Sequence, residues 1–149
     1  MKIGLICSHG GHLTEMVEMQ AAFAGHSVFY VTYDSERAET LARHEQVYQL
    51  QNIGVSPWRL LRATWIASRI FHRERPDMLV STGSEIALPF FYLAWLLGIK
   101  TIFIESVCRL STPSQTGRLV YPIATEFFVQ WPALAPVYGP KAQFAGGLL

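Results

Sequence analysis

Residues 2–16, KIGLICSHGGHLTEM, join a short apolar run to a turn of small residues and then to a helical pattern. The run Lys2–Cys7 predicts a strand, and Leu13 and Met16 recur at the spacing of a helix after the paired glycines. A strand, a glycine turn and a helix in this order form the first unit of a sheet whose strands are joined by helices. This stretch therefore predicts an α/β fold.

The rest of the chain continues this alternation, without sequence repeats or a linker rich in Pro, Gly or Ser. We expect further strands at Ser27–Tyr33, Gln46–Leu50, Met78–Ser81, Thr101–Glu105 and Phe127–Gln130. We expect helices from Ser35 to about Arg43, over Pro57–Arg73, over Glu85–Leu97 and, as a short one, over Leu119–Ala124. Strands separated by crossover helices predict a Rossmann-like parallel sheet with helices on both faces, formed by residues 1–149 as a single domain.

The composition excludes several classes of protein. The chain has 149 residues, half of them hydrophobic, which is enough for one core without disulfides or metals. Its net charge is +1, with 12 basic and 11 acidic residues, so it lacks the overall charge of a nucleic-acid-binding protein. Cys7 and Cys108 have no Cys or His at metal-ligand spacing. We therefore expect two buried, reduced thiols, no metal site and no cofactor.

The low charge suggests contact with a membrane or a partner. Only 15% of the residues are charged and the mean hydropathy is +0.22, which favours some exposed apolar surface. The first residues lack the long apolar region and cleavage site of a secretory signal, so we expect the protein on the cytoplasmic side. The apolar stretch Ile86–Ile99 has roughly 14 residues, whereas a spanning helix needs about 20. It predicts a buried helix or, alternatively, one that dips into a membrane.

Open parallel sheets bind ligands beyond the carboxyl ends of their strands, so the residues that follow each strand are the candidates for a site. In the first such turn, Gly10 and Gly11 let backbone N–H groups approach an anion at the start of a helix, although a turn chosen only for packing would look the same. His12 follows and is a candidate general base. The turn is not a Gly-x-Gly-x-x-Gly fingerprint, and the sequence has no phosphate loop ending in Gly-Lys-Ser/Thr.

Two later strands end in comparable segments. Thr82, Gly83 and Ser84 open the next apolar helix and are suited to phosphate or sugar hydroxyls, although Ser84 as a helix cap explains them equally well. Glu105 ends a hydrophobic strand, with Arg109 four residues later. A carboxylate there predicts a ligand-binding or catalytic role, with an ion pair to Arg109 as the alternative.

The helix predicted over residues 57–73 is rich in Arg and Trp. Helical spacing places Trp58, Leu61 and Trp65 on one side, flanked by arginines that include Arg59, Arg62 and Arg69. Such a helix can lie in a membrane interface, with aromatic rings at headgroup depth and Arg on anionic lipid. The alternative is a crossover helix with its tryptophans in the core and its arginines reaching solvent.

These motifs together resemble one family. The residues that carry the resemblance are Ser8–Glu15, Pro76-Asp77 with Ser81–Ser84, Phe103–Arg109, Tyr121–Ala124 and Phe128–Pro132. The family is the membrane-associated subunit of the two-subunit UDP-N-acetylglucosamine transferase of dolichol-linked oligosaccharide assembly, with its bacterial capsule and exopolysaccharide counterparts. The resemblance covers nearly the whole chain. It departs at His9, where a small residue is more usual, and in lacking the membrane-spanning helix with which eukaryotic members begin.

The resemblance implies the acceptor-side half of a split GT-B glycosyltransferase. Such an enzyme transfers a sugar from a UDP-sugar to a polyprenyl-diphosphate-linked acceptor with inversion, at the cytoplasmic face of a membrane. A separate donor-binding subunit would share the UDP-sugar. His12 and Glu105 are the candidate catalytic residues. The expected substrate-binding residues are Ser8, Gly10, Gly11, Thr14, Thr82, Gly83, Ser84, Glu85 and Arg109.

Anchoring would come from the basic helix, from the apolar helix after Glu85 or from the partner. Two other function classes remain as alternatives. One is a stand-alone small enzyme or regulator that binds a nucleotide, which the absence of both nucleotide fingerprints disfavours. The other is a non-catalytic scaffold that recruits a partner to the membrane.

Overall fold

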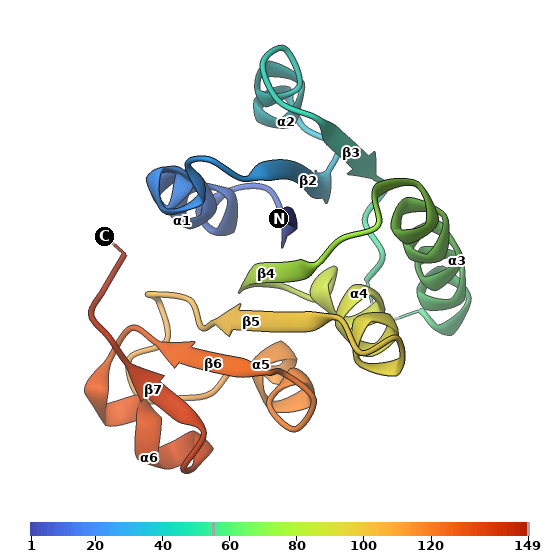
Figure 1. The fold of residues 1–149 in the computed structure, drawn as a ribbon. Helices are drawn as coiled ribbons and strands as arrows, with labels where there is room; N and C mark the ends of the chain where they lie inside the picture. The colour runs from blue at the N-terminus through green and yellow to red at the C-terminus, as the bar shows by residue number, and fades with distance from the viewer. Residues whose placement is uncertain (55, 149) are drawn as a thin grey trace.

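The computed structural model of the protein describes residues 1–54 and 56–148. Its strands form one seven-stranded parallel sheet in the order β3-β2-β1-β4-β5-β6-β7 (Figure 1). The strands are β1 (Lys2–Cys7), β2 (Ser27–Tyr33), β3 (Val47–Leu50), β4 (Met78–Gly83), β5 (Lys100–Ile104), β6 (Glu126–Val129) and β7 (Ala142–Phe144). The expected parallel α/β architecture is confirmed.

Helices connect the strands. They are α1 (Gly11–Glu18), α2 (Glu36–Leu41), α3 (Pro57–Glu74), α4 (Ala87–Leu96), α5 (Gln115–Val120) and α6 (Ala135–Tyr138), with 3₁₀ turns η1 (Gln20–Phe23) and η2 (Pro132–Leu134). Helix α3 begins with Pro57, whose fixed φ suits the first helical position. It ends before Arg75, which adopts a left-handed φ of 48°.

The strand order reverses beside β1. The chain first builds outward from β1 through β2 to β3, and α3 then carries it back to β4 on the other side of β1. The carboxyl ends of β1 and β4 therefore meet at the point where ligands bind in open α/β sheets. Strand β4 extends to Gly83, two residues beyond the predicted end at Ser81. Gly10 and Gly11 after β1 therefore lie close to Gly83 in space, as the pairing of Cys7 with Gly83 shows.

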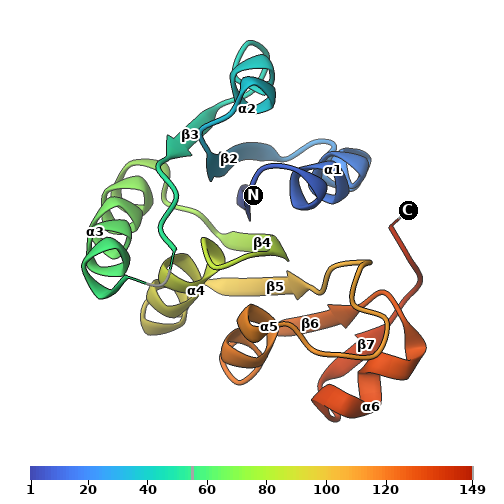
Figure 2. The same ribbon diagram turned by 180° about the vertical axis from the view of Figure 1, so that it is seen from behind.

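Helices cover both faces of the sheet, as the views from the front and from behind show (Figures 1 and 2). Apolar residues of α3, α4 and α5 pack on one face in a core that includes Phe29, Phe103 and Phe127. On the other face, Leu13 and Met16 of α1 pack against β1 and its neighbours. Because both faces are covered, β1 is buried along nearly its whole length, which explains its continuous apolar sequence.

Three predictions about the elements are corrected. The short helix near Leu119–Ala124 lies at Gln115–Val120 instead, because the Ser114 hydroxyl accepts a hydrogen bond from the Gly117 N–H and starts the helix earlier. The strand after β5 is not the last, since three residues of β7 pair with β6. The apolar helix begins at Ala87 rather than Glu85, and Ser84 makes no side-chain cap to it.

The apolar helix α4 is only half buried. Phe90, Phe91 and Ala94 are in the core, whereas Trp95 and Leu96 are exposed. Within residues 1–54 and 56–148, no helix has both the length and the apolar character needed to cross a bilayer.

The two cysteines differ in environment. Cys7 is buried as expected, and burial raises the pKa of its thiol to about 12. Cys108 lies on the surface, so the prediction that both thiols are buried is wrong for this residue. It belongs to the segment that follows β5 rather than to the core strand itself.

Candidate functional site

The first glycine turn leaves the start of α1 open to a ligand. Gly10 precedes the helix with a φ of 82°, a conformation that favours glycine, and no side chain caps the first turn. The backbone N–H groups there have no partner within the helix, and the helix dipole adds positive potential. The turn can therefore receive an anionic group.

The second glycine turn makes room for His12. Gly83 has a φ of 121°, and a Cβ at this position would lie 2.9 Å from Cε1 of the His12 ring. Any larger residue would be strained and would push the ring away. Gly83, which was predicted to help bind phosphate or sugar hydroxyls, thus also leaves space for the imidazole ring of His12.

Two hydrogen bonds join the turns and fix His12. The His12 Nδ1 atom lies 2.8 Å from the carbonyl oxygen of Thr82, and the Thr82 hydroxyl donates to the His12 carbonyl at 2.8 Å. A carbonyl oxygen only accepts, so Nδ1 carries the proton. In the neutral ring Nε2 is then unprotonated and free to accept a proton, as a general base must.

Unlike His12, Glu105 has a buried side chain whose two carboxylate oxygens both accept hydrogen bonds from the protein. It is 1% exposed, and its carboxylate accepts hydrogen bonds from Ser106 N at 3.0 Å, from Ser114 N at 3.2 Å and from the Ser114 hydroxyl at 2.8 Å. The Tyr138 hydroxyl donates to the same carboxylate. Burial and this hydrogen bond raise the pKa of Tyr138, so the phenol remains a donor. The carboxylate holds together the segment after β5, the start of α5 and helix α6.

A second buried carboxylate, that of Glu15, also forms hydrogen bonds with the segment after β5. It is 2% exposed and accepts from the Ser106 hydroxyl at 3.0 Å, from Val107 N at 3.3 Å and from Gln130 Nε2 at 3.1 Å. Gln130 also donates to the Glu105 carbonyl at 3.0 Å. Sequence reasoning missed Glu15 and Gln130 as site residues. The available signal was that Glu15 lies three residues after His12, on the same face of α1.

Glu85 follows β4 and is linked to β2 by a hydrogen bond from Tyr33. It accepts from the Ser84 hydroxyl at 2.6 Å and from the Tyr33 hydroxyl at 2.9 Å. Partial burial opposes ionisation, but the hydrogen bonds from Ser84, from the backbone and from Tyr33 outweigh it and lower the pKa of Glu85. Its carboxylate is therefore ionised at neutral pH.

These groups surround one cleft of about 480 Å³ at the carboxyl ends of β1, β4 and β5, which we call the polar cleft. It is lined by Gly11, His12, Glu15, Ser84, Glu85, Glu105, Ser106, Cys108, Arg109, Ser114, Gln115 and Thr116. Both candidate catalytic residues reach it. Glu105 and Arg109 form no ion pair among the described residues, so that alternative is wrong.

Some of the expected substrate-binding residues lie outside the lining. The Thr14 hydroxyl donates to the Gly10 carbonyl at 3.3 Å and accepts from Arg37 at 2.7 Å, so it shapes the first turn. Ser8 is buried, and its hydroxyl lies 3.4 Å from the His9 carbonyl. Thr82 and Gly83 instead contact the ring of His12, Thr82 through its carbonyl oxygen and Gly83 by close approach. Within residues 1–54 and 56–148, no cluster of His, Cys, Asp and Glu is arranged to hold a metal ion.

Comparison with known proteins places the chain in a family. The family described as "Oligosaccharide biosynthesis protein Alg14 like" matches residues 3–148. The chain belongs to this Alg14-like family. The resemblance inferred from the motifs is thereby confirmed.

Similar proteins include "UDP-N-acetylglucosamine transferase subunit ALG14" of Homo sapiens, which is 34% identical over 95 residues. That match covers 60% of this chain and 44% of the human protein, so it spans less than half of that relative. The "UDP-N-acetylglucosamine--N-acetylmuramyl-(pentapeptide) pyrophosphoryl-undecaprenol N-acetylglucosamine transferase" of Geobacillus kaustophilus is 29% identical over 94 residues, covering 62% of this chain and 26% of that protein.

The fold matches somewhat less than half of several longer chains of known structure. The crystal structure of MurG from Acinetobacter baumannii superposes with a TM-score of 0.80 at 21% identity, and the match covers 99% of this chain and 46% of MurG. A UDP complex of MnaA from S. aureus superposes with a TM-score of 0.77 at 13% identity, covering 99% of this chain and 44% of MnaA. At these identities the likeness concerns the fold.

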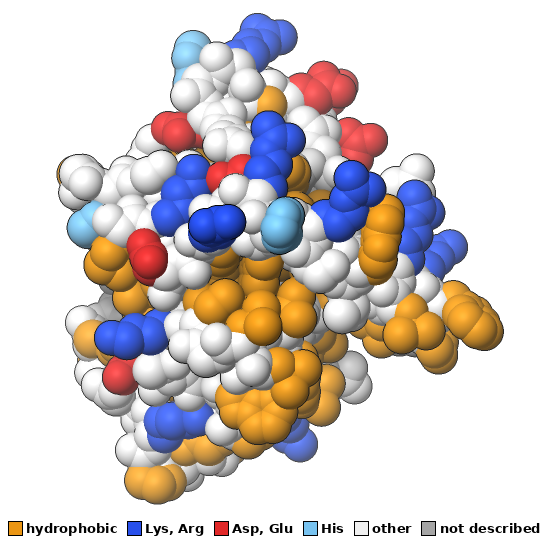
Figure 3. All heavy atoms as spheres, turned by 45° about the vertical axis from the view of Figure 1, so that its right-hand side comes forward, with side chains coloured by type: hydrophobic (Ala, Val, Ile, Leu, Met, Phe, Trp, Pro, Cys, Tyr) orange, Lys and Arg blue, Asp and Glu red, His pale blue; other side chains and the backbone are white. Residues whose placement is uncertain are grey.

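Away from the polar cleft, the Alg14-like chain exposes the aromatic side of α3. Trp58 is 80% exposed, Leu61 62% and Trp65 59%, so the alternative that the tryptophans lie in the core is wrong. The core contacts of α3 come from Ala63, Ala67, Ile70 and Phe71. Figure 3 shows basic and apolar side chains gathered on the side of the molecule formed by α3 and α4. We call Trp58, Arg59, Leu61, Arg62, Trp65 and Arg69 the α3 face.

Proposed function

We propose that this chain is the acceptor-side subunit of a split, inverting glycosyltransferase. The enzyme would transfer a sugar, N-acetylglucosamine or another hexose, from a UDP-sugar to a polyprenyl-diphosphate-linked acceptor at the cytoplasmic face of a membrane. The observation that carries the proposal is the position of His12 in the polar cleft. Its Nδ1–H is committed to the Thr82 carbonyl, and its Nε2 is free, between two glycine turns.

The chemistry follows from this arrangement. Nε2 of His12 takes the proton of the acceptor hydroxyl as the hydroxyl oxygen attacks the anomeric carbon of the donor. The bond from that carbon to the UDP oxygen breaks on the opposite side, and UDP leaves with the electron pair. The uncapped start of α1 offers N–H groups and positive potential to the negative charge of the phosphates.

Between the two candidate catalytic residues, the geometry favours His12 as the base. The Glu105 carboxylate accepts four hydrogen bonds from groups of its own chain, so a proton arriving there would break existing contacts. We assign Glu105 the role of positioning residue. It holds Ser114 and the segment after β5, which form one wall of the polar cleft.

A donor-binding partner subunit is part of the proposal. The human relative is named as a transferase subunit, and the fold of this chain corresponds to 46% of a MurG chain. Both facts support a second chain that supplies most of the sugar-nucleotide site. The α3 face would rest on the membrane, with Trp58 and Trp65 at headgroup depth, which brings the polar cleft near a lipid-linked acceptor.

Binding and turnover measurements on the chain alone and on the reconstituted pair test this function. We expect negligible transferase activity and weak UDP-sugar affinity from the isolated chain, and turnover once the donor-binding subunit is added. Micromolar UDP-sugar binding by the isolated chain in calorimetry would instead support a stand-alone nucleotide-binding enzyme. A pair whose turnover survives both His12→Ala and Glu105→Gln would reduce this subunit to a scaffold.

A further inference from the structure

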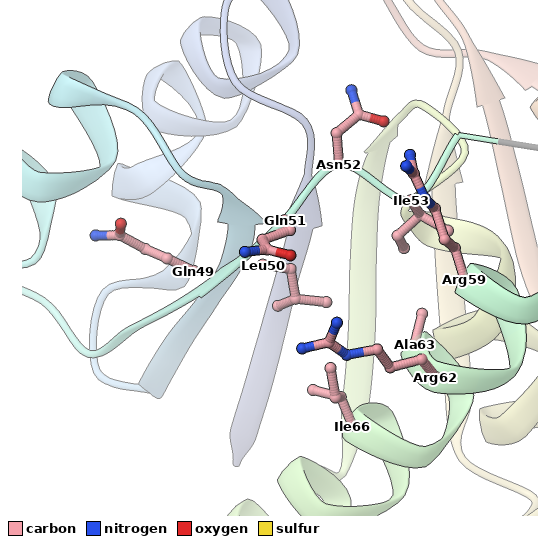
Figure 4. Close-up of a pocket in the computed structure, with 9 residues that line it drawn as sticks. All are labelled: Gln49, Leu50, Gln51, Asn52, Ile53, Arg59, Arg62, Ala63 and Ile66. Atoms are coloured by element: carbon pink, nitrogen blue, oxygen red, sulfur yellow. The ribbon is translucent and has the colours of Figure 1, made fainter.

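A groove outside the polar cleft runs between the edge strand β3 and helix α3. It consists of two recesses of about 600 Å³ each, which share Gln49, Leu50 and Ile66. The first recess lies where β3 ends and α3 begins, and Figure 4 draws the residues that line it. We call this first recess the headgroup recess.

The headgroup recess combines cationic and amide side chains over an apolar floor. Arg59 and Arg62, which are three residues apart and so share one side of α3, extend from the helix toward the segment 49–53 (Figure 4). Gln51 and Asn52 stand on the wall opposite. The floor consists of Leu50, Ile53, Ala63 and Ile66. No carboxylate is present in this lining, so its charge is positive.

The two arginines of this recess have unused donors. Within residues 1–54 and 56–148, neither Arg59 nor Arg62 forms an ion pair. The other arginines of α3 are engaged: Arg69 stacks on the Trp65 ring at 4.9 Å, and Arg73 lies 3.8 Å from Glu74.

Asn52 adds a further donor on the opposite wall. Its Oδ1 atom accepts from Gly54 N at 2.9 Å, and among residues 1–54 and 56–148 its NH₂ group has no hydrogen-bond partner.

We propose that the headgroup recess binds the phosphate group of an anionic bilayer phospholipid. The planar guanidinium matches two phosphate oxygens at once, and the amides supply further donors. The exposed side chains of Trp58 and Leu61 belong to the same turns of α3 and would enter the bilayer beside the bound headgroup. A soluble phosphate would gain nothing from contact with these apolar side chains, whereas a lipid would, so we assign the recess to a lipid.

This inference rests on the proposed membrane role of the α3 face and adds one defined lipid position to it. Diffuse attraction depends only on the number of charges near the surface. A headgroup recess depends in addition on which arginine is changed and on the shape of its donor group. Diffuse attraction and a headgroup recess therefore predict different losses of vesicle binding when two substitutions each remove one positive charge. They also differ for a substitution that keeps the charge and changes only the donor group.

Flotation of the full chain with phosphatidylcholine vesicles containing phosphatidylglycerol separates them. We expect Arg62→Gln to weaken binding roughly tenfold more than Arg69→Gln, although each removes one positive charge from α3. We expect Arg62→Lys, which keeps the charge but loses the guanidinium fork, to weaken binding about fivefold or more. Thermal melting of each variant shows that it remains folded.

Equal losses for Arg62→Gln and Arg69→Gln, with Arg62→Lys like the parent, would overturn the headgroup recess and leave the membrane role of the α3 face intact. Unchanged flotation in Trp58→Ala with Trp65→Ala, or no vesicle binding by the parent, would overturn that membrane role as well. Titration with inorganic phosphate provides the remaining comparison. Binding of phosphate without vesicles, lost in Arg62→Gln, would show a site for a soluble anion and overturn the lipid assignment.

Discussion

The polar cleft and the α3 face satisfy their polar groups in opposite ways. In the cleft, Glu15 and Glu105 are almost fully buried and each carboxylate accepts several hydrogen bonds from the protein. On the α3 face, Arg59 and Arg62 form no ion pair among the described residues, beside tryptophans that are largely exposed. The cleft is organised before a ligand arrives, whereas the α3 face presents its donors and apolar area to solvent, where an external surface can reach them.

This difference indicates where each region would be sensitive to substitution. A buried acceptor that loses its partners keeps the cost of desolvation, so changes in the cleft alter geometry and stability as well as chemistry. An exposed arginine loses little when it is replaced, unless its partner is present. Substitutions in the cleft should therefore show their effects in the isolated protein, and those on the α3 face only with vesicles. His12 should be the exception in the cleft, because its Nε2 is free for the substrate.

The largest effect is expected at His12. Replacing it by Ala removes the proposed base and should lower turnover of the reconstituted pair by about a hundredfold or more. The assay uses a polyprenyl-linked acceptor with a UDP-sugar. His26→Ala removes an exposed imidazole far from the cleft and serves as the matched control. If His12→Ala retains turnover within about threefold of the parent, the base belongs to the partner chain.

On the α3 face, the combined replacement of Arg59, Arg62 and Arg69 by Gln should weaken binding to anionic vesicles by about a hundredfold or more at low salt. Diffuse attraction contributes about 1 kcal/mol for each arginine near such a surface, and the loss of the headgroup contacts of Arg62 adds to this. The free energy of unfolding should stay within about 0.5 kcal/mol of the parent value, because all three side chains are exposed. Vesicle sedimentation at two salt concentrations checks the first statement. Parent binding that does not depend on salt would contradict it.

Glu105→Gln should destabilise the protein by about 1–3 kcal/mol, measured by urea unfolding. Both carboxylate oxygens accept hydrogen bonds, one from Ser106 N and the other from Ser114 and Tyr138. An amide NH₂ must therefore face at least one donor, whichever way it is turned. Glu18→Gln, at an exposed position of α1, is the control. A variant as stable as the parent would show that the carboxylate does not hold the wall of the cleft.

The sequence predicted the parts of the site that depend on local order. Gly10, Gly11 and Thr82-Gly83 were identified because each was placed after a predicted strand, whereas the adjacency of β1 and β4 that brings them together was not predicted. The contact between the His12 ring and Gly83 was not predictable, since it depends on the register of β1 against β4. Glu15 was missed because an acidic residue in the middle of a helix is ordinarily exposed.

The α3 face shows a second limit of prediction from the sequence. Helical spacing correctly placed Trp58 and Trp65 together, but the pattern fits a buried stripe as well as an exposed one. The opposite side of α3 carries Ala63, Ala67 and Ile70, whose smaller side chains let the helix pack closely on the sheet. Which of the two sides faces the core depends on how α3 crosses the sheet, so the spacing alone left both arrangements open.

The smallest effect concerns Glu85, at the edge of the polar cleft. Its pKa is lowered in the folded protein, where Ser84 and Tyr33 donate to the carboxylate and outweigh its partial burial. Because this pKa is lower in the folded than in the unfolded protein, the ionised carboxylate stabilises the fold at pH values above the ordinary pKa of glutamate. That stabilisation is lost as the pH falls through the pKa of the folded protein. Glu85→Gln should thus cost on the order of 1 kcal/mol at pH 7, with solvent reducing the figure because Glu85 is only partly buried, and progressively less toward pH 3. Thermal unfolding of the parent and of Glu85→Gln across this range measures the difference in stability. A gap that stays constant with pH would mean that the carboxylate charge at this edge of the cleft does not contribute to folding.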